Sequence, residues 1–287
     1  MGRLNPEWTP WLRLLERTLA AADDPAWAGL GPEPGPAGAV ATGAPLLHGA
    51  ILAVDPRRAR RWVRELLDLA APHLSPDGVR RARSAARSLD PLELLESAAA
   101  RDHPRLETLA ADARVDPHAL AAVAELAVRP LLQACGRGWA DRTPRDWPHG
   151  YCPICGAWPA LVEMRGLDRA RHLRCAGCGG DWAWSVLHCA YCGETEHTRL
   201  GALVIDGEEE TRRVETCMSC RGYTKAITTL VRIPAPSVAV EDLRTVELDL
   251  SALDRGYQRP GGPGFSPVVR VVGDRTRAAR TPTRAAG

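Results

Sequence analysis

Eight cysteines in the middle of the chain form four Cys-x-x-Cys pairs, a spacing at which one tight turn directs two thiolates at the same metal ion. The pairs are Cys152/Cys155, Cys175/Cys178, Cys189/Cys192 and Cys217/Cys220. A tetrahedral zinc or iron ion takes four such soft ligands, so two pairs complete one closed site. The four pairs therefore predict two metal sites, each with four cysteine ligands.

Glycines support this prediction. Gly156, Gly179 and Gly193 directly follow the second cysteine of their pairs, whereas Arg221 follows Cys220 and a glycine comes one position later. Glycine reaches positive φ freely, which lets backbone N–H groups turn toward the sulfurs and compensate their charge. Arginines near the pairs can add to that compensation, although plain solvated charge is the simpler interpretation of each. These are Arg171, Arg174, Arg212 and Arg213.

Two other uses of paired cysteines fit less well. Structural disulfides belong to secreted proteins, and the first residues of this chain contain no apolar signal region. Redox-active pairs usually occur singly on a thioredoxin-like unit, not as four in series. The ninth cysteine, Cys135, lies in an apolar run and is predicted to be a small buried residue.

Consecutive pairs are the natural partners. The intervals 156–174 and 193–216 suit the hairpin of a zinc ribbon or a rubredoxin-like module, although spacing alone leaves an interleaved pairing open. We expect strands at 159–164, 171–174, 200–205, 211–216 and 223–233. Residues 182–187 also show the period-2 alternation of a strand. Their tryptophans are expected to cover the apolar faces of the small modules or, in an alternative interpretation, to stack on nucleic-acid bases.

Residues 1–148 are expected to form a helical domain. A capping residue followed by proline, a typical helix start, precedes each of several amphipathic stretches. These starts are Thr9-Pro10, Asp55-Pro56, Ser75-Pro76, Asp90-Pro91 and Asp116-Pro117. Pro130 is expected to end or kink the last of these helices.

The predicted fold class is therefore α+β: an N-terminal all-α helical domain followed by two small rubredoxin-like or zinc-ribbon β modules. The predicted domains are residues 1–148, the first metal module at 149–188, the second module with a C-terminal segment at 189–259, and a disordered basic tail at 260–287. A short helix is expected at 238–253 within the second module.

Composition restricts the partners. The formal net charge is +2, which gives no general attraction for nucleic acid or membranes. From the sequence, we expect no apolar run long enough to span a bilayer. No nucleophile–base pair, Gly-rich phosphate loop or His-Glu-x-x-His motif occurs, and a closed four-cysteine site has no open coordination position. Catalysis is therefore not expected.

The ordered motifs resemble the formate dehydrogenase accessory protein FdhE family over roughly residues 86–260. The resemblance is carried by Arg129-Pro130-Leu131-Leu132, Trp147, the four cysteine pairs, Trp182, Tyr223-x-Lys225, Val240-Glu241-Asp242-Leu243 and Gly256-Tyr257-x-Arg259. Residues 1–85 match the family pattern poorly.

This resemblance implies a non-catalytic cytoplasmic factor needed to make active formate dehydrogenase. It implies iron bound by the eight paired cysteines, although zinc also fits, especially after heterologous expression. The implied partner is the catalytic subunit of the dehydrogenase, and Glu241, Asp242 and Leu243 are the candidate contact residues. A rubredoxin-like electron carrier and, less favoured, a zinc-ribbon nucleic-acid-binding protein are the alternatives. The sequence does not indicate the oligomeric state.

Overall fold

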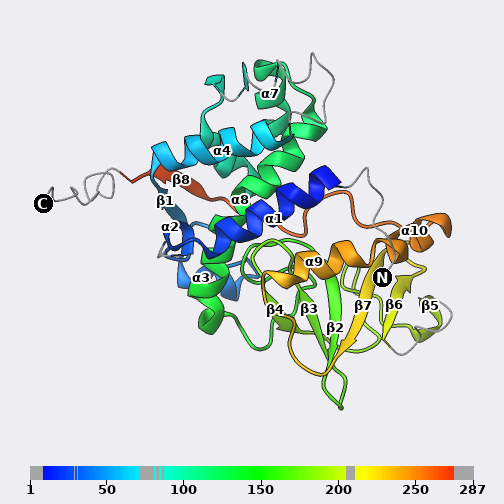
Figure 1. The fold of residues 1–287 in the computed structure, drawn as a ribbon. Coiled ribbons are helices and arrows are strands. Elements are labelled where there is room, and N and C mark those ends of the chain that lie inside the picture. Colours follow the sequence, from blue (N-terminus) through cyan, green and yellow to red (C-terminus); the bar gives the residue numbers. More distant parts are fainter. Residues whose placement is uncertain are drawn as a thin grey trace, which may run out of the picture. The chain divides into compact units, whose positions relative to one another are not determined.

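A computed structural model describes residues 9–28, 30, 32–70, 81, 84–85, 87–204 and 211–274. These residues divide into two compact units (Figure 1). The first unit draws on residues 1–33, 50–131 and 268–287, and the second on 34–49 and 132–267. The α+β fold class is confirmed. The finer division at residues 148, 188 and 259 remains a prediction.

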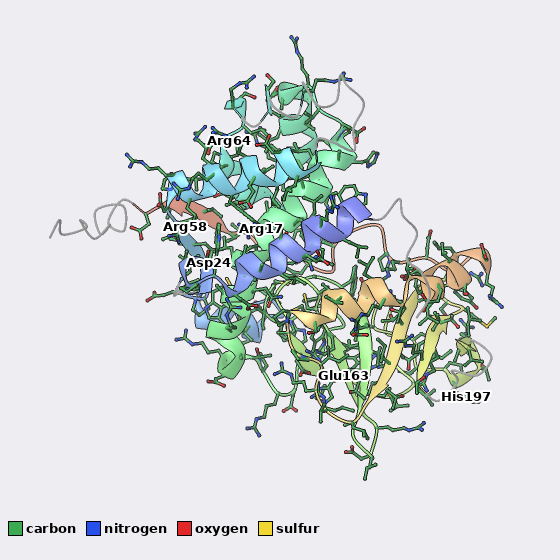
Figure 2. The ribbon with its side chains drawn as sticks, in the orientation of Figure 1. Arg17, Asp24, Arg58, Arg64, Glu163 and His197 are labelled. Carbon is green, nitrogen blue, oxygen red and sulfur yellow. The ribbon has the colours of Figure 1, made fainter. Side chains whose placement is uncertain are left out.

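The first unit is mainly helical. Its helices are α1 (Thr9–Asp23), α2 (Pro25–Ala28), α4 (Pro56–Ala70), α6 (Pro91–Ala100), α7 (His103–Ala113) and the first part of α8 (Pro117–Trp139). Leu66, Leu94, Leu95 and Leu120 are almost fully buried in its core. Arg17 of α1 pairs with Glu65 of α4, and Arg58 of α4 donates to the Ala26 carbonyl (Figure 2).

Three predicted helix starts are confirmed by side-chain caps. Carboxylate oxygens of Asp55, Asp90 and Asp116 accept N–H bonds at the starts of α4, α6 and α8. α1 is already helical at Thr9, the first described residue, so the predicted cap at Thr9 stays a prediction, and Ser75-Pro76 lies outside the described residues. Asp102 caps α7 in the same way, a start that the sequence patterns missed because Pro104 follows one position later than in the other motifs.

Pro130 does not end its helix, because α8 continues to Trp139. A helical proline lacks an N–H group and leaves carbonyls of the preceding turn without their usual donor. Here the indole N–H of Trp62 donates at 2.9 Å to the Ala127 carbonyl, one residue after Leu126, whose carbonyl loses the donor that Pro130 lacks. Contrary to expectation, residues 117–142 are long and apolar enough to span a membrane. However, 61% of the most apolar stretch of this segment is buried inside the protein.

A two-stranded parallel sheet corrects the all-α prediction for the N-terminal region and the disorder predicted for the tail. β1 (Ile51–Val54) pairs with β8 (Arg270–Gly273). The tail prediction is therefore wrong at 270–273, where Val271 is buried and its N–H donates to Glu96. β1 and β8 lie far apart in the sequence, so local sequence patterns give no sign that they pair.

The second unit contains the six-stranded sheet that carries the cysteine pairs. Its strands are β2 (Leu161–Arg165), β3 (Ala170–Arg174), β4 (Asp181–Ala183), β5 (Leu200–Val204), β6 (Arg212–Cys217) and β7 (Tyr223–Thr229). The spatial order is β4-β3-β2-β7-β6-β5. Each predicted ribbon contributes three strands, and a parallel pairing of β2 with β7 joins the two ribbons.

Helices α9 (Ser237–Arg244) and α10 (Val246–Asp254) pack on one face of this sheet (Figure 1). Val238 of α9 joins Leu161 and Ile227 in one apolar cluster. Leu248 of α10 joins Val214 and Tyr223 in another. The single helix expected at 238–253 is thus two helices, separated at Thr245. The unit also contains α3 (Ala37–Ala41) and the 3-10 helices η3 (Ala140–Arg142) and η4 (His197–Arg199).

Candidate metal centres

The structure groups the eight paired cysteines into two clusters, each built from consecutive pairs. Cys152, Cys155, Cys175 and Cys178 form centre 1, and Cys189, Cys192, Cys217 and Cys220 form centre 2. Within each cluster all four sulfurs lie within 4.8 Å of one another. This is the grouping favoured from the sequence, rather than an interleaved one.

The sulfur spacing fits a tetrahedral ion. The Sγ–Sγ distances across centre 1 include 3.5 Å for Cys152–Cys178 and 3.6 Å for Cys155–Cys175. Two corresponding distances in centre 2 are both 3.7 Å. Metal–sulfur bonds of about 2.3 Å in a tetrahedron place sulfurs about 3.8 Å apart, whereas a disulfide would bring them to about 2.05 Å. Both clusters can therefore hold one zinc or iron ion each.

The two centres differ in burial. All four cysteines of centre 1 are at most 1% exposed. In centre 2, Cys189 and Cys217 are buried, Cys220 is partly exposed and Cys192 is exposed. Solvent, chelators and other proteins therefore have access to the sulfurs of centre 2 that they lack at centre 1.

All four knuckles share one turn geometry. The N–H of the first cysteine donates to the carbonyl five residues later, at 2.8 to 3.0 Å, in Cys152 to Ala157, Cys175 to Gly180, Cys189 to Glu194 and Cys217 to Gly222. The predicted glycines occupy the left-handed region at φ +78°, +75° and +76°. In the fourth knuckle the N–H of Gly222 lies 3.4 Å from Cys220 Sγ.

Arg221 takes the glycine position of the fourth knuckle with φ +57°. A left-handed conformation costs a non-glycine residue about 1–2 kcal/mol. Contacts of the side chain offset this cost, because its guanidinium donates to the Arg255 carbonyl at 2.8 Å and lies 4.1 Å from the centre of the Tyr257 ring. The arginine thus links centre 2 to the end of α10.

Backbone N–H groups also affect the thiols. Burial raises the pKa of Cys217, but hydrogen bonds from the amides of Cys220 and Ser219 outweigh it and leave the pKa below its usual value. At Cys217 the backbone therefore favours the thiolate, the form that binds a metal. Cys135 lies outside both clusters and is fully buried, as predicted.

Comparisons with known proteins show a similarity over the C-terminal part of the chain. Residues 187–265, which include centre 2, α9 and α10, match the FdhE C-terminal domain. An FdhE homolog from Shewanella sp. (strain MR-4) is 34% identical over 108 residues, or 37% of this chain and 35% of the relative. Another from Aquifex aeolicus is 32% identical over 117 residues, or 39% of this chain and 40% of the relative.

The C-terminal part of the chain is therefore similar to the C-terminal domain of FdhE proteins. These alignments span little more than a third of the length of the relatives. The crystal structure of the FdhE protein from Pseudomonas aeruginosa extends the likeness of the fold, with a TM-score of 0.58 and 23% identity over 90% of this chain and 87% of that one.

Three of the FdhE-like motifs outside the cysteines meet in one ion-pair cluster: Tyr223-x-Lys225, Val240-Glu241-Asp242-Leu243 and Gly256-Tyr257-x-Arg259. Lys225, the single lysine of the chain, is fully buried on β7 and lies 2.7 Å from Asp242 and 2.6 Å from Asp249. Arg259 contacts the same two carboxylates at 2.7 and 3.0 Å. Burial raises the pKa of Asp242, but Arg259 and Lys225 outweigh it and hold the pKa below its usual value. The motif therefore fastens α9 and α10 to the sheet.

This cluster qualifies the contact residues predicted from sequence. The carboxylate of Asp242 faces Lys225 and Arg259 inside the unit. Glu241 instead pairs with the exposed Arg244 at 2.8 Å, and Leu243 is partly exposed. The side chains of Asp242 and Glu241 are 28% and 21% exposed, so burial does not separate them, and the contact role of all three residues stays a prediction.

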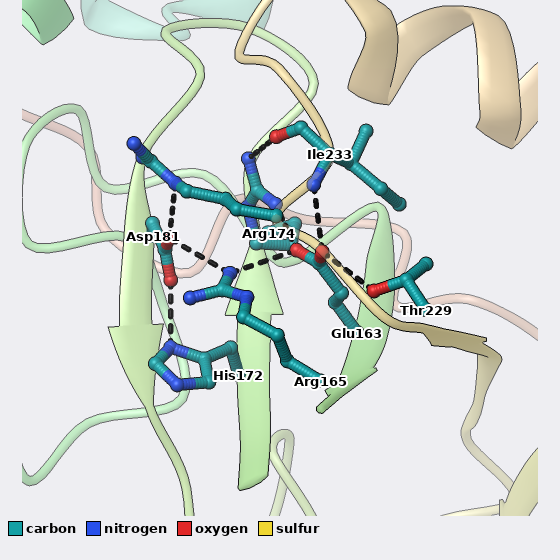
Figure 3. Close-up of polar contacts among 8 residues, drawn as sticks. Glu163, Arg165, His172, Arg174, Asp181, Thr229 and Ile233 are labelled. Carbon is teal, nitrogen blue, oxygen red and sulfur yellow. Dashed lines mark hydrogen bonds and ion pairs between the residues drawn. The ribbon is translucent and has the colours of Figure 1, made fainter. Parts of the chain in front are cut away.

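A second polar network lies on the strands of the first ribbon, which carries centre 1 (Figure 3). Glu163 on β2 is fully buried and accepts four hydrogen bonds, from Arg165, Arg174, Thr229 and the Ile233 N–H. Asp181 on β4 binds Arg165, Arg232 and His172 at 2.6 to 2.9 Å. The network ties β2, β3 and β4 to the segment after β7.

Most of the arginines that could compensate the negative charge of the sulfurs form ion pairs with carboxylates instead. Arg174 is fully buried and pairs with Glu163, so the simple solvated interpretation is wrong for it. Arg171 and Arg213 both contact Glu215. Sequence reasoning missed Glu163, Asp181 and Glu215, because isolated acids on short strands look like ordinary solvent-facing residues.

Proposed function

We propose that this protein is an accessory factor for the maturation of formate dehydrogenase, that it binds the catalytic subunit of that enzyme, and that it has no turnover of its own. The similarity of residues 187–265 to the FdhE C-terminal domain is the observation that supports this role most directly. The two closed four-cysteine clusters add to it, because four protein ligands leave no open position for a substrate. A cytoplasmic location, away from nucleic acid and membranes, belongs to the same proposal.

The proposed native metal is iron at both centres, held by the eight paired cysteines. When bound, iron with four cysteine ligands supplies a one-electron couple, whereas zinc does not change oxidation state. Ferric thiolate sites absorb visible light and zinc sites are colourless. Purification without air from an iron-replete native host, followed by metal analysis and visible spectroscopy, separates the two. A colourless protein with stoichiometric zinc would remove iron from the proposal.

Deletion of the gene tests the role. We expect formate-dependent dye reduction to fall while the dehydrogenase polypeptide remains present, and we expect the two proteins to co-purify. Complementation with Cys189→Ser/Cys192→Ser should fail, whereas Cys135→Ala, a buried thiol outside both clusters, should restore activity. Normal formate dehydrogenase activity in the deletion strain, with no co-purification, would contradict the proposal.

The contact surface proposed for the enzyme includes the outer side of α9. Glu241→Lys and Leu243→Asp alter two of the three proposed contact residues and should weaken co-purification without changing the metal content. The matched control is Glu247→Lys on α10, an exposed acid outside the segment. Equal co-purification of all three variants would place the contact elsewhere.

An electron carrier is the second candidate, and the exposure of Cys192 at centre 2 favours it. Electron transfer requires a metal close to the surface, which centre 2 offers and centre 1 does not. Reversible reduction of the iron-loaded protein, with loss of the signal in Cys189→Ser/Cys192→Ser, would support this role. Loss of the metal upon reduction would exclude it.

A further inference from the structure

The sulfurs of centre 1 are closed off from water, so its metal ion needs a route in and out. All four cysteines are at most 1% exposed. A chelator or a metal donor therefore reaches the sulfurs only when a neighbouring segment moves away, and the segment that costs the least to detach supplies the route. The described segments that pack on the two cysteine turns of this centre differ strongly in that cost.

Two of these segments belong to the core. α8 packs so closely on the second turn that a Cβ atom at Gly136 would lie 1.9 Å from the Cys178 carbonyl oxygen. On the first turn, the N–H groups of Leu46 and Leu47 donate at 2.8 and 2.9 Å to the carbonyls of the two residues between the cysteines. Both leucines and Leu132 of α8 are buried, so detachment of either segment would return apolar area to water.

Residues 261–265, which we call the strap, are held far more lightly. Among the described residues, two hydrogen bonds join the strap to the first ribbon. The Trp158 indole donates to the Gly262 carbonyl at 3.0 Å, and the Phe265 N–H donates to the Gly156 carbonyl at 2.9 Å. None of the five strap residues is buried, and three of them are glycines, which regain much conformational freedom on detachment.

The strap nevertheless closes the first cysteine turn of centre 1 on both flanks. A Cβ atom at Gly264 would lie 2.4 Å from Cβ of Tyr151, the residue before the first cysteine. One at Gly156, the residue after the second cysteine, would lie 2.7 Å from the Phe265 carbonyl oxygen. Glycine permits both of these close approaches, so the strap lies directly on the turn.

Centre 2 contains an equivalent turn that no described segment covers in this way. Gly193 is the counterpart of Gly156, and the nearest described atom to a Cβ there would be a ring nitrogen of His188 at 3.8 Å. Cys192, which precedes Gly193, is exposed, whereas Cys155, which precedes Gly156, is fully buried. The contrast indicates that the strap contributes to the burial of centre 1.

Contacts fix the chain on both sides of the strap. Before it, Arg259 binds the carboxylates of Asp242 and Asp249, and the Gln258 N–H donates to a carbonyl of the fourth knuckle at 2.9 Å. After it, Pro267 is buried. The middle of the strap can therefore lift while both of its ends stay attached.

We propose that the strap is a tethered lid over centre 1, and that its detachment is the step that admits and releases the metal ion of this centre. Centre 2 needs no such step, because one of its cysteines is already exposed. The inference applies to zinc and iron alike and does not depend on which enzyme the protein serves.

The test uses the zinc-loaded full chain and a coloured zinc chelator. Because detachment precedes capture, the slow phase of release, which empties centre 1, should reach a plateau rate as the chelator concentration rises. In Gly264→Ala the added methyl keeps the strap away from Tyr151, so the plateau should rise at least tenfold while the zinc content and the fast phase stay unchanged. The matched control is Gly261→Ala, whose methyl meets nothing within 4 Å and should leave the plateau unchanged.

A second variant and a direct probe keep the test independent of one substitution. Phe265→Ala removes the ring contacts with Tyr151 and His48 without a clash and should also raise the plateau. Phe265 is the single phenylalanine of the chain, so fluorophenylalanine gives one ¹⁹F resonance that reports the strap. In Gly264→Ala this resonance should move toward its position in the unfolded chain.

Three results would overturn the proposal. The first is a shifted resonance in Gly264→Ala with an unchanged plateau, which would mean that the metal leaves by another route. The second is a release rate that rises in proportion to chelator without a plateau. The third is a plateau that climbs steeply in about 1 M urea, because detachment of five residues exposes little surface whereas unfolding of the ribbon exposes much.

Discussion

Centre 1 and centre 2 repeat the same four-cysteine arrangement in opposite surroundings. Centre 1 is enclosed by protein, and the fully buried ion pair of Glu163 with Arg174 lies on the two strands between its cysteine pairs. Centre 2 exposes Cys192 and adjoins an open cavity. The comparison indicates that identical ligands can serve a structural site and an accessible one, with the difference set by what packs around them.

Removal of two ligands from either centre should give the largest contrast. Binding of a structural zinc ion contributes an apparent ~10–16 kcal/mol to the folding of a small module. Cys152→Ser/Cys155→Ser should therefore lose one ion and expose residues near 150–187 to protease. Cys189→Ser/Cys192→Ser should lose one ion with cleavage confined to 189–222. Metal analysis and limited proteolysis measure both, and the helical unit should stay intact. Unfolding of the whole chain in one step would contradict this independence.

Glu163→Gln should be the most damaging single substitution outside the cysteines. It leaves the guanidinium of Arg174 buried without its carboxylate, which costs about 3–5 kcal/mol. The matched control is Glu241→Gln, whose partner Arg244 is exposed, with an expected cost below about 0.5 kcal/mol. Urea unfolding measures the two. Similar losses would mean that the buried network does not stabilise the region of centre 1.

Two glycines at equivalent knuckle positions should respond differently. In Gly179→Ala the new methyl would lie 2.3 Å from Cβ of Ala235, so crowding of about 1–3 kcal/mol adds to the backbone cost. In Gly193→Ala the nearest atom is 3.8 Å away, which leaves only the backbone cost of about 1–2 kcal/mol. Thermal unfolding of the metal-bound variants measures which of the two substitutions costs more stability. A larger loss for Gly193→Ala would contradict the packed and open surroundings.

The ion-pair cluster near centre 2 should show a pH dependence of defined sign. Asp242→Asn should cost about 2 kcal/mol at neutral pH, because Asp249 still pairs with Lys225 and Arg259. The pKa of Asp242 is lowered from 3.8, so its stabilisation is present above that value and is lost as the pH falls through the lower pKa of the folded state. The difference between the two proteins, measured by urea unfolding, should hold from pH 7 to about 5 and shrink below about 3.8. If the stability difference between the two proteins instead grew as the pH fell, the lowered pKa of Asp242 would be contradicted.

Chelation should give the smallest and most direct contrast. A coloured zinc chelator added to the zinc-loaded protein should withdraw one equivalent at least tenfold faster than the second, which corresponds to about 1.4 kcal/mol in activation free energy. The fast phase should disappear in Cys189→Ser/Cys192→Ser and persist in Cys152→Ser/Cys155→Ser. A single phase of two equivalents would mean that the difference in burial does not control access.

The sequence predicted what depends on local spacing. Cysteine pairs three residues apart and Asp-Pro helix starts act within one turn, so Cys152 to Cys220, Asp90 and Asp116 could be located in advance. Pairing between β2 and β7, or β1 and β8, depends on residues far apart in the chain and leaves no local pattern. The buried carboxylate of Glu163 was equally hidden, because its four donors come from three separate segments. Lys225 did carry a signal as the single lysine in an arginine-rich chain, but only its contacts reveal its role.

The parallel pairing of β2 with β7 affects how the protein can be made. During synthesis the first ribbon leaves the ribosome before Tyr223–Thr229 exists, so one side of β2 stays without its neighbour until most of the second ribbon has followed. Open strand edges of this kind promote association between nascent chains. Fragments that stop after centre 1 should therefore aggregate even when they carry their ion, and slow translation between residues 189 and 222 should lower the yield of intact protein.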